Sequence, residues 1–402
     1  MRTNLFAATA MGLVMTAAAG TAHADEVTAW RLFVSDHAEP RVTAIDALES
    51  KIIDTFQIKG PASLYRSESG SAVYAVQGSA NVVTAISTGL SFDDHGDHGD
   101  IDIEAPTLTG FEIAGEYPVH FVQHHDQWAA FFDKEGIARV FSDREALEGK
   151  ADSREVNSGA PHHGVVVAYG SHDLVSVPHP EDPSKLPVGI RIQDRSSAQV
   201  GDVASCPDLH GEASSGNLLI FACATGLLVV KSAAGAPEIT HVPYAASLPQ
   251  GKSTTVIGGK GMQYFLGNYG ADKVVLIDPT ETDGFRLIEL PTRRVHFAVD
   301  PIRAKFAYIF TEDGQLHQVD VIRGAVTNSL TLTEPYSMDG HWSDPRPRVA
   351  VAGDNVVVTD PLKGVLRLVA ADGFTKAGEI AVAGKPFNIV AVGGSGESHD
   401  HD

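Results

Sequence analysis

The chain has 402 residues, of which 51 are acidic and 30 basic, so its formal net charge at pH 7 is −21. A charge of this size and sign argues against nucleic acid as a partner, because such binding depends on neutralising phosphates. It also disfavours anionic membrane surfaces, whereas it attracts cations and helps to keep a protein soluble.

Residues 1–24 are predicted to be a signal peptide. Arg2 supplies a positive start, Leu5–Ala19 is an apolar run too short to span a bilayer, and Ala22–Ala24 offers a cleavage site of small residues. We therefore expect cleavage between Ala24 and Asp25 and export to the periplasm. No later segment approaches the ~18 consecutive apolar residues that a membrane-spanning helix needs.

Beyond the signal peptide, short strand patterns dominate and helical periodicity is scarce. Turn residues recur every eight to twelve positions between these patterns, which is typical of a meander of antiparallel strands. The clearest strand patterns are Trp30–Val34, Arg41–Asp46, Lys51–Phe56, Lys273–Asp278, Gln315–Asp320 and Val356–Asp360. A repeat of about 40 residues built from four short strands indicates a β-propeller.

We predict an all-β chain with a single propeller over residues 25–395, a monomer with about eight four-stranded blades. The innermost strands are expected near Pro61, Pro118, Pro161, Pro207, Thr254, Arg294, Met338 and Pro386. The last of these has no strands after it, so the C-terminal strand should complete the first blade and close the ring. Seven blades is the competing count, because the region 89–115 is irregular.

That irregular region contains an acidic segment, residues 91–105, which we expect to be a flexible loop. Glycines and carboxylates replace hydrophobic alternation at its start. Two histidines and two aspartates, Asp94, His95, Asp97 and His98, make it a candidate secondary metal site; a solvated acidic loop is the alternative. Residues 396–402 should form a disordered tail that carries His399 and His401.

Five histidines recur at nearly one spacing. They are His120, His163, His210, His296 and His341, with gaps of 43, 47, 86 and 45 residues. A residue that returns once per blade occupies the same place in every blade, and here that place is the mouth of the central channel. Imidazole is the commonest metal ligand in proteins. The alternative for each histidine is a hydrogen bond to the backbone of a neighbouring blade.

Three of these histidines, His120, His163 and His210, fall on consecutive blades, so they could surround one ion. Asp208 could complete the coordination shell or orient an imidazole, and His162 is a reserve ligand. His341 occupies the equivalent position in a later blade. Because the expected mature chain keeps only two methionines, Met262 and Met338, the donor set favours Zn²⁺ over a copper carrier's sulfur-rich set.

Cys206 and Cys223 are the only cysteines, and in an oxidising compartment they should form a disulfide. The residues between them suggest strand, turn and strand, so we expect the bond to join two strands of one hairpin. Two thiolate metal ligands are the alternative.

The chain resembles the AztD family of periplasmic zinc metallochaperones. The resemblance depends on Pro118–Phe121, Pro161–Gly164, Cys206–Gly211 and Asp94–His98, together with the signal peptide and the propeller repeats. It implies a carrier without enzymatic activity that hands zinc directly to the solute-binding protein of a zinc ABC importer. The acidic loop would then be a transfer arm.

Two other functions remain open at this stage. A metal-dependent propeller enzyme, a hydrolase or an oxidoreductase, would need a general base beside a metal-bound water, and Glu212 or Asp208 could serve. A metal-free propeller that binds another protein through its flat face is the other possibility.

Overall fold

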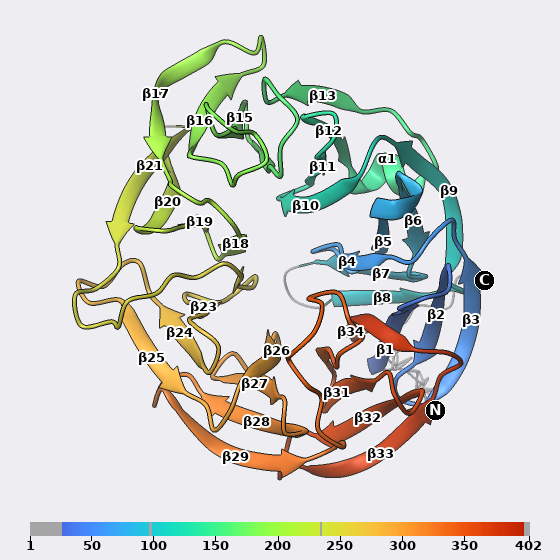
Figure 1. The fold of residues 1–402 in the computed structure, drawn as a ribbon. Coiled ribbons are helices and arrows are strands. Elements are labelled where there is room, and N and C mark those ends of the chain that lie inside the picture. Colours follow the sequence, from blue (N-terminus) through green and yellow to red (C-terminus); the bar gives the residue numbers. More distant parts are fainter. Residues whose placement is uncertain (1–25, 96–98, 234, 398–402) are drawn as a thin grey trace, which may run out of the picture.

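The computed structural model describes residues 26–95, 99–233 and 235–397, which form a ring of eight β-sheets around a central channel (Figure 1). The predicted signal peptide and residues 398–402 lie outside the described residues. Each sheet is one blade, and its strands are hydrogen-bonded in order from the channel outward. The eight-bladed propeller predicted from the sequence is therefore confirmed.

From the channel outward, the strands of the first four blades are as follows. Blade 1 contains β34 (Pro386–Glu397), β1 (Glu26–Asp36), β2 (Arg41–Asp46) and β3 (Lys51–Gln57). Blade 2 contains β4 (Ser63–Arg66), β5 (Ala72–Gln77), β6 (Val82–Ser87) and β9 (Thr107–Ala114). Blade 3 contains β10 (Pro118–His124), β11 (Gln127–Phe132), β12 (Ile137–Ser142) and β13 (Arg154–Asn157). Blade 4 contains β14 (Val166–Tyr169), β15 (His172–Val177), β16 (Gly189–Asp194) and β17 (Gln199–Ser205).

The other four blades follow the same plan. Blade 5 contains β18 (Glu212–Ser215), β19 (Leu218–Cys223), β20 (Gly226–Ala233) and β21 (Ala236–Pro243). Blade 6 contains β22 (Val256–Ile257), β23 (Phe265–Asn268), β24 (Lys273–Ile277) and β25 (Phe285–Glu289). Blade 7 contains β26 (Arg294–Val299), β27 (Phe306–Thr311), β28 (Gln315–Asp320) and β29 (Ala325–Thr331). Blade 8 contains β30 (Val349–Ala352), β31 (Asn355–Asp360), β32 (Val365–Ala370) and β33 (Thr375–Ala381).

The core lies between neighbouring blades, because each sheet is covered on both faces. A strand such as β19 is therefore buried along its whole length, whereas the outermost strand β3 is mostly exposed. Between blades 2 and 3, Tyr74 packs against Trp128 with ring centroids 4.8 Å apart, and Trp128 stacks on Phe121. These contacts fix the position of β10, which lines the channel.

The ring closes in blade 1, where the C-terminal strand β34 pairs with the N-terminal strand β1, as the sequence predicted. Asp36 strengthens this closure, because its Oδ2 accepts from the Lys385 backbone N–H at 2.8 Å and from the Arg41 guanidinium at 2.7 Å. Burial raises the pKa of Asp36, but the hydrogen bonds to its carboxylate lower that pKa by more.

The innermost strands all run in one direction, so the channel has two distinct mouths. We call the mouth where these strands begin, for example at Pro118 and Pro386, the first mouth. The second mouth is where they end.

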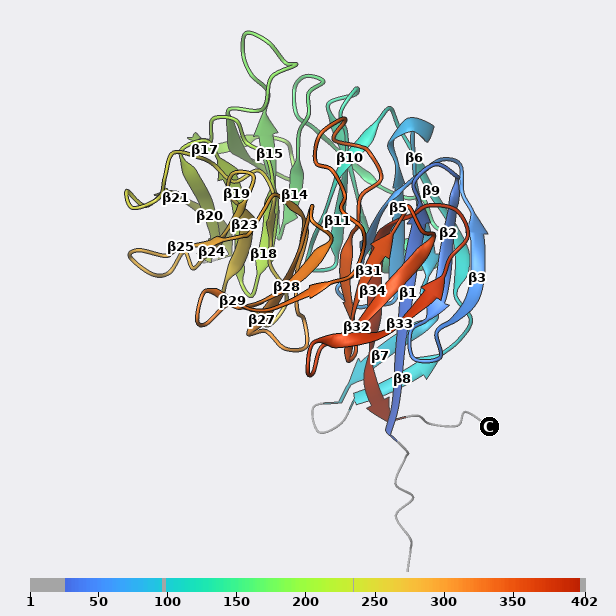
Figure 2. The same cartoon turned by 60° about the horizontal axis from the view of Figure 1, so that its bottom comes forward.

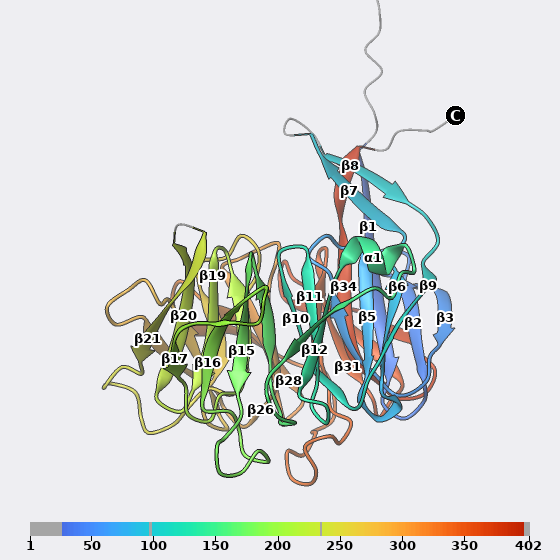
Figure 3. The same ribbon diagram turned by 90° about the horizontal axis from the view of Figure 1, so that it is seen from above.

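Two short strands, β7 (Leu90–Asp94) and β8 (Gly99–Ile103), extend blade 1 beyond the second mouth (Figures 2 and 3). Asp100 of β8 pairs with Glu397, the last residue of β34. The segment 91–105, expected to be a flexible loop, is thus largely a hairpin, and residues 396 and 397, expected in the tail, belong to β34. The hairpin forms because Leu90 and Ile101 have buried side chains.

The described residues also form two short helices. The helix α1 (Asp143–Leu147) follows β12 and has a capping box formed by Ser142 and Glu145. The single-turn helix η1 (Gly78–Ala80) follows β5. Among the described residues, no helix has the length and apolar character to cross a membrane.

Candidate metal centre

Three imidazoles meet at the first mouth of the channel. His120, His163 and His210 each offer a ring nitrogen, and these nitrogens lie within 4.8 Å of one another. The ring centroids are 4.7 Å apart for His120 and His163, 5.3 Å for His163 and His210, and 5.8 Å for His120 and His210. This group, called the triad here, comes from blades 3, 4 and 5.

The local backbone places each triad residue at the channel. His120 lies in β10 where the register with β11 shifts between Pro118 and Phe121, so a bulge takes it out of regular pairing. His163 and His210 lie in the segments that lead into β14 and β18. Gly211 follows with φ of +97°, and a Cβ there would lie 2.8 Å from the Thr254 carbonyl oxygen, so only glycine fits.

The Nδ1 atom of each triad imidazole faces an oxygen of another residue. His163 Nδ1 lies 2.7 Å from Asp133 Oδ2, and His210 Nδ1 lies 2.7 Å from the Thr254 carbonyl oxygen. His120 Nδ1 lies 3.3 Å from Glu212 Oε1. Because these oxygens are acceptors, each Nδ1 donates its proton and each Nε2 is the nitrogen that can bind a metal.

The Thr254 carbonyl is itself held in place. The Asn268 side-chain oxygen accepts from the backbone N–H groups of Thr254 and Thr255, each at 2.7 Å. The preceding residue, Ser253, donates its backbone N–H to the Tyr244 hydroxyl at 2.9 Å. The acceptor for His210 is thus fixed before any ligand arrives.

The Nε2 atoms of His120 and His163 are only 3.1 Å apart. Two nitrogen lone pairs at this separation repel unless a proton lies between them. Burial lowers the pKa of His120, but the carboxylates of Glu212 and Asp133 together raise it by more, so the net shift is upward. Burial lowers the pKa of His210.

Two carboxylates beside the triad each have one oxygen without a protein partner. Asp133 Oδ1 and Glu212 Oε2 are buried and accept no hydrogen bond from the described residues. Such negative charge is costly unless a cation lies nearby, so the arrangement fits a bound cation. Sequence reasoning missed Asp133, which looks like an ordinary turn residue after β11. Its only signal is that this turn lies at the mouth where β10 begins.

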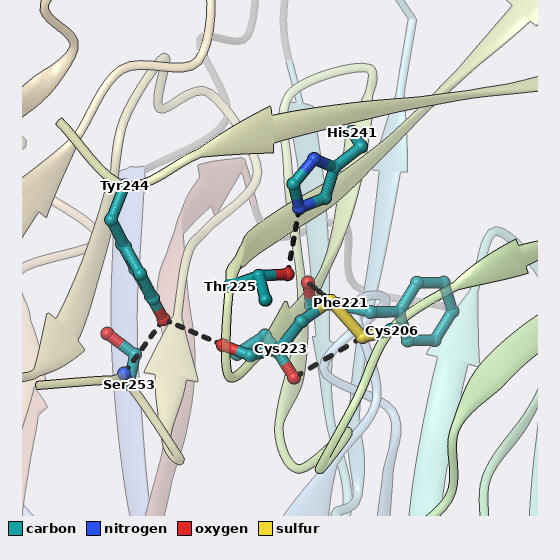
Figure 4. The surroundings of a disulfide bond; sticks show 8 residues. Cys206, Phe221, Cys223, Thr225, His241, Tyr244 and Ser253 are labelled. Carbon is teal, nitrogen blue, oxygen red and sulfur yellow. Dashed lines mark hydrogen bonds between the residues drawn. A yellow bond between two sulfur atoms is a disulfide. The ribbon is translucent and has the colours of Figure 1, made fainter.

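The predicted disulfide between Cys206 and Cys223 is confirmed, with Cα atoms 4.9 Å apart (Figure 4). Its placement differs from the single hairpin that we expected. Cys206 follows β17 of blade 4, where its N–H donates to the Val188 carbonyl, whereas Cys223 ends β19 of blade 5. The bond therefore links two blades, and it closes the segment that carries His210 and Glu212.

The other predicted ligands do not join the triad. His162 is buried, with Nε2 2.8 Å from Ser176 Oγ and Nδ1 2.8 Å from the Ala160 carbonyl, so both of its ring nitrogens are engaged away from the triad. Asp208 turns outward and forms an ion pair with Lys252 at 2.9 Å.

His341 is exposed in a loop, because β30 begins at Val349 and not near Met338 as predicted. His296 does lie in its innermost strand, but its Nδ1 accepts from the Val349 N–H at 3.0 Å.

The acidic histidine segment lies on the opposite side of the ring. His95 Nε2 is 3.0 Å from Asp100 Oδ2 at the β7–β8 hairpin, beyond the second mouth. Asp97 and His98 lie outside the described residues, and of Asp94 only the backbone is described. The 12 residues of β34 run from the first mouth to this hairpin, which is about 40 Å at the rise of an extended strand.

The fold and the triad define a class of protein, an eight-bladed propeller with a three-histidine metal-binding geometry at one mouth of its channel. Comparisons with known proteins narrow this class. The chain is 53% identical over 407 residues to the zinc chaperone AztD of Citrobacter koseri, an alignment that covers 100% of this chain and 97% of that protein. The chain therefore belongs to the AztD family. No protein-family model matches it.

Solved structures agree with this assignment. The crystal structure of Citrobacter koseri AztD superposes with a TM-score of 0.91 at 55% identity, covering 93% of this chain and 100% of that chain. The apo form of the same protein gives a TM-score of 0.89 at 54% identity, covering 92% and 99%. The dihydro-heme d1 dehydrogenase NirN has a TM-score of 0.61 at 12% identity, over 89% of this chain and 74% of that chain, and shares the fold alone.

Proposed function

We propose that this chain is a zinc chaperone that binds one Zn²⁺ through the Nε2 atoms of His120, His163 and His210. The observation that carries the proposal is the orientation of the imidazoles, whose Nδ1 atoms are all engaged by fixed acceptors. Ligand nitrogens around tetrahedral zinc lie ~3.3 Å apart, given Zn–N distances of ~2.0–2.1 Å. The triad nitrogens need only small shifts to reach that spacing.

The charge around the triad suits a divalent cation that must also be released. Asp133 and Glu212 supply negative charge through two of the imidazoles, while the direct ligands are neutral. Three protein ligands leave a fourth position for water or for a ligand from another molecule. An incoming ligand can therefore bind the ion before the triad releases it, so the metal is never free.

We propose that the recipient is the solute-binding protein of a zinc ABC importer and that the exchange occurs in the periplasm. The interblade disulfide and the net charge of −21 support an exported, cation-attracting protein. The relative from Citrobacter koseri is named a zinc chaperone. We propose no catalytic role, since Glu212 Oε1 faces His120 and the Asp208 carboxylate pairs with Lys252.

The segment around His95 and Asp100 is proposed as a second, weaker zinc site. Its place beyond the second mouth means that it acts separately from the triad, and not as an arm that reaches into it.

Competition with a chelating zinc indicator tests the main site. We expect one tightly bound zinc per wild-type chain. The triple variant His120→Ala, His163→Ala, His210→Ala should lose it while circular dichroism shows an intact fold. Tight zinc binding by that folded triple variant would overturn the site. Mixing the zinc-loaded wild type with the apo solute-binding protein then tests the transfer.

A further inference from the structure

We propose that the loop between β29 and β30, residues 332–348, is the docking element for the protein that receives the metal, with Trp342 as its anchor. This inference rests on the proposed zinc-chaperone function and names the surface that brings the acceptor to the triad. It follows from the exposure of Trp342, the rigidity of its loop and the position of that loop at the first mouth.

Trp342 has the largest exposed fraction of the large hydrophobic side chains that the structure describes, at 80%. Exposing an indole is unfavourable, because aromatic side chains contribute most when buried. Exposed tryptophans that gain a pocket on binding are typical anchors of protein interfaces. A tryptophan held in water in this way therefore indicates a contact with another protein.

The loop that carries Trp342 is held together by one buried arginine side chain. Arg346, whose exposed fraction is 6%, donates hydrogen bonds to the backbone carbonyls of Ser337, Asp339 and His341. The Asp339 carboxylate also pairs with Arg293 at 2.8 Å. Because these bonds fix the loop before binding, little conformational entropy is lost when Trp342 meets a partner.

Contacts with innermost strands place the loop at the first mouth. His37, next to the start of β34, donates through Nε2 to the Ser343 carbonyl at 2.6 Å. Arg293, which holds Asp339, directly precedes β26. The loop projects from the face opposite the β7–β8 hairpin (Figure 3).

A second exposed side chain extends the surface. Leu362, in the turn between β31 and β32, has an exposed fraction of 64% and lies at the same mouth. Its backbone N–H donates to the hydroxyl of Tyr336, a buried residue of the Trp342 loop, at 2.9 Å. Trp342 and Leu362 thus stand on one connected unit.

The position of the Trp342 loop in the ring indicates which protein docks on it. The triad comes from blades 3, 4 and 5, and blade 8 lies directly across the channel from blade 4. The His163 side chain is 32% exposed, so a ligand can reach it from outside. A protein that takes zinc from the triad by direct contact must cover this mouth and will meet the blade 8 loops on its other side. It should offer an apolar pocket for the indole beside its own metal ligands.

The test measures zinc transfer from the loaded chain to the apo solute-binding protein under second-order conditions. Trp342→Ala should slow transfer about tenfold, and Leu362→Ala should slow it about threefold. Ile322→Ala is the matched control, because Ile322 is 74% exposed in the turn between β28 and β29, at the second mouth. It should transfer zinc at the wild-type rate.

Two further measurements separate this inference from the proposed function. All three variants should bind zinc as tightly as the wild type and lose it to a small chelator at the same rate, since none touches the triad. A wild-type rate of protein-to-protein transfer in Trp342→Ala would overturn the docking role and leave the zinc site standing. A wild-type dimer that Trp342→Ala dissociates would also overturn it, by assigning the surface to a second copy of this chain.

Discussion

Blades 3 and 7 each place a histidine at the same position of the innermost strand, but the two histidines have different roles. His120 and His296 each occupy the third position of an innermost strand, and in both strands the register with the next strand shifts at that point. His120 Nδ1 faces the Glu212 carboxylate, whereas His296 Nδ1 accepts from the Val349 N–H. The first arrangement leaves Nε2 available as a ligand; the second puts the ring proton on Nε2.

The surroundings reinforce this difference. His296 lies beside Arg348 and Arg294, which together with burial hold the pKa of His296 well below its usual range. The triad lies beside Asp133 and Glu212. A histidine at a channel position therefore becomes a metal ligand or a structural residue according to what its other nitrogen meets, and sequence spacing does not contain that information.

The largest expected effect on zinc affinity is the difference between removing a triad histidine, His163, and removing His296 of blade 7. His163→Ala should weaken zinc binding by more than about a hundredfold, because loss of a direct ligand exceeds the 10–100-fold effect of an outer residue. His296→Ala should leave zinc affinity within about twofold. Competition titrations with a chelating indicator measure both. Equal losses of zinc affinity in the two variants would show that His163 and His296 do not differ in their role in zinc binding.

The disulfide is found only on the triad side, so its loss should affect both stability and zinc binding. The double variant Cys206→Ser, Cys223→Ser should lose about 3 kcal/mol of unfolding free energy by loop-closure entropy. It should also bind zinc less tightly, because the closed segment carries His210. Urea unfolding and zinc titration of the same sample are the measurements. Unchanged zinc affinity in the destabilised variant would mean that the neighbouring strands alone position His210.

Removing the charge that orients one imidazole should have a smaller effect. Asp133→Asn can still accept a hydrogen bond from His163 but carries no charge, so zinc affinity should fall by roughly tenfold to a hundredfold. Asp208→Asn is the matched control, because Asp208 pairs with Lys252 outside the triad. Its titration curve should overlay that of the wild type, and a comparable loss there would return Asp208 to the ligand set.

The smallest expected effect is the pH dependence of folding stability that arises from His296, which lies beside Arg294 and Arg348. The pKa of His296 is lowered in the folded chain, so below its unfolded value of ~6.5 the unfolded state binds more protons. The folded chain therefore keeps its full stability with respect to His296 above pH ~6.5. It loses stability as the pH falls below that value, because protons then bind to the unfolded state. His296→Gln should therefore show a smaller fall in Tm between pH 7.5 and 5.5 than the wild type. Parallel curves for the two proteins would contradict the assignment.

Much of the ring could be predicted from the sequence, because blade patterns are local. Alternating residues and turns identify the strands, and the unpaired strand at Pro386 predicts the closure with β1. The prediction failed near Met338, where Pro335, Pro345 and Pro347 interrupt the repeat and the chain forms a long loop before β30.

The site could be predicted only in part. The spacing placed His120, His163 and His210 at the channel correctly, but it placed His341 there wrongly. The partners of the triad, such as Asp133 and Thr254, come from turns that carry no motif. The disulfide pairing was correct, yet its link between two blades depends on where β17 ends. The acidic segment with its histidines was recognised in the sequence. Its position beyond the second mouth was not, because that position depends on the direction of β34, which a repeat pattern does not reveal.

Ring closure by β34 has a consequence for the order of biosynthesis. The innermost strand of blade 1, β34, follows every other described strand in the sequence, so blade 1 stays incomplete until β34 has been synthesised. The part of the chain that precedes β34, including all three triad histidines, is therefore synthesised while β1 still has an open sheet edge. A prematurely terminated chain cannot seal the ring and should be removed by proteases.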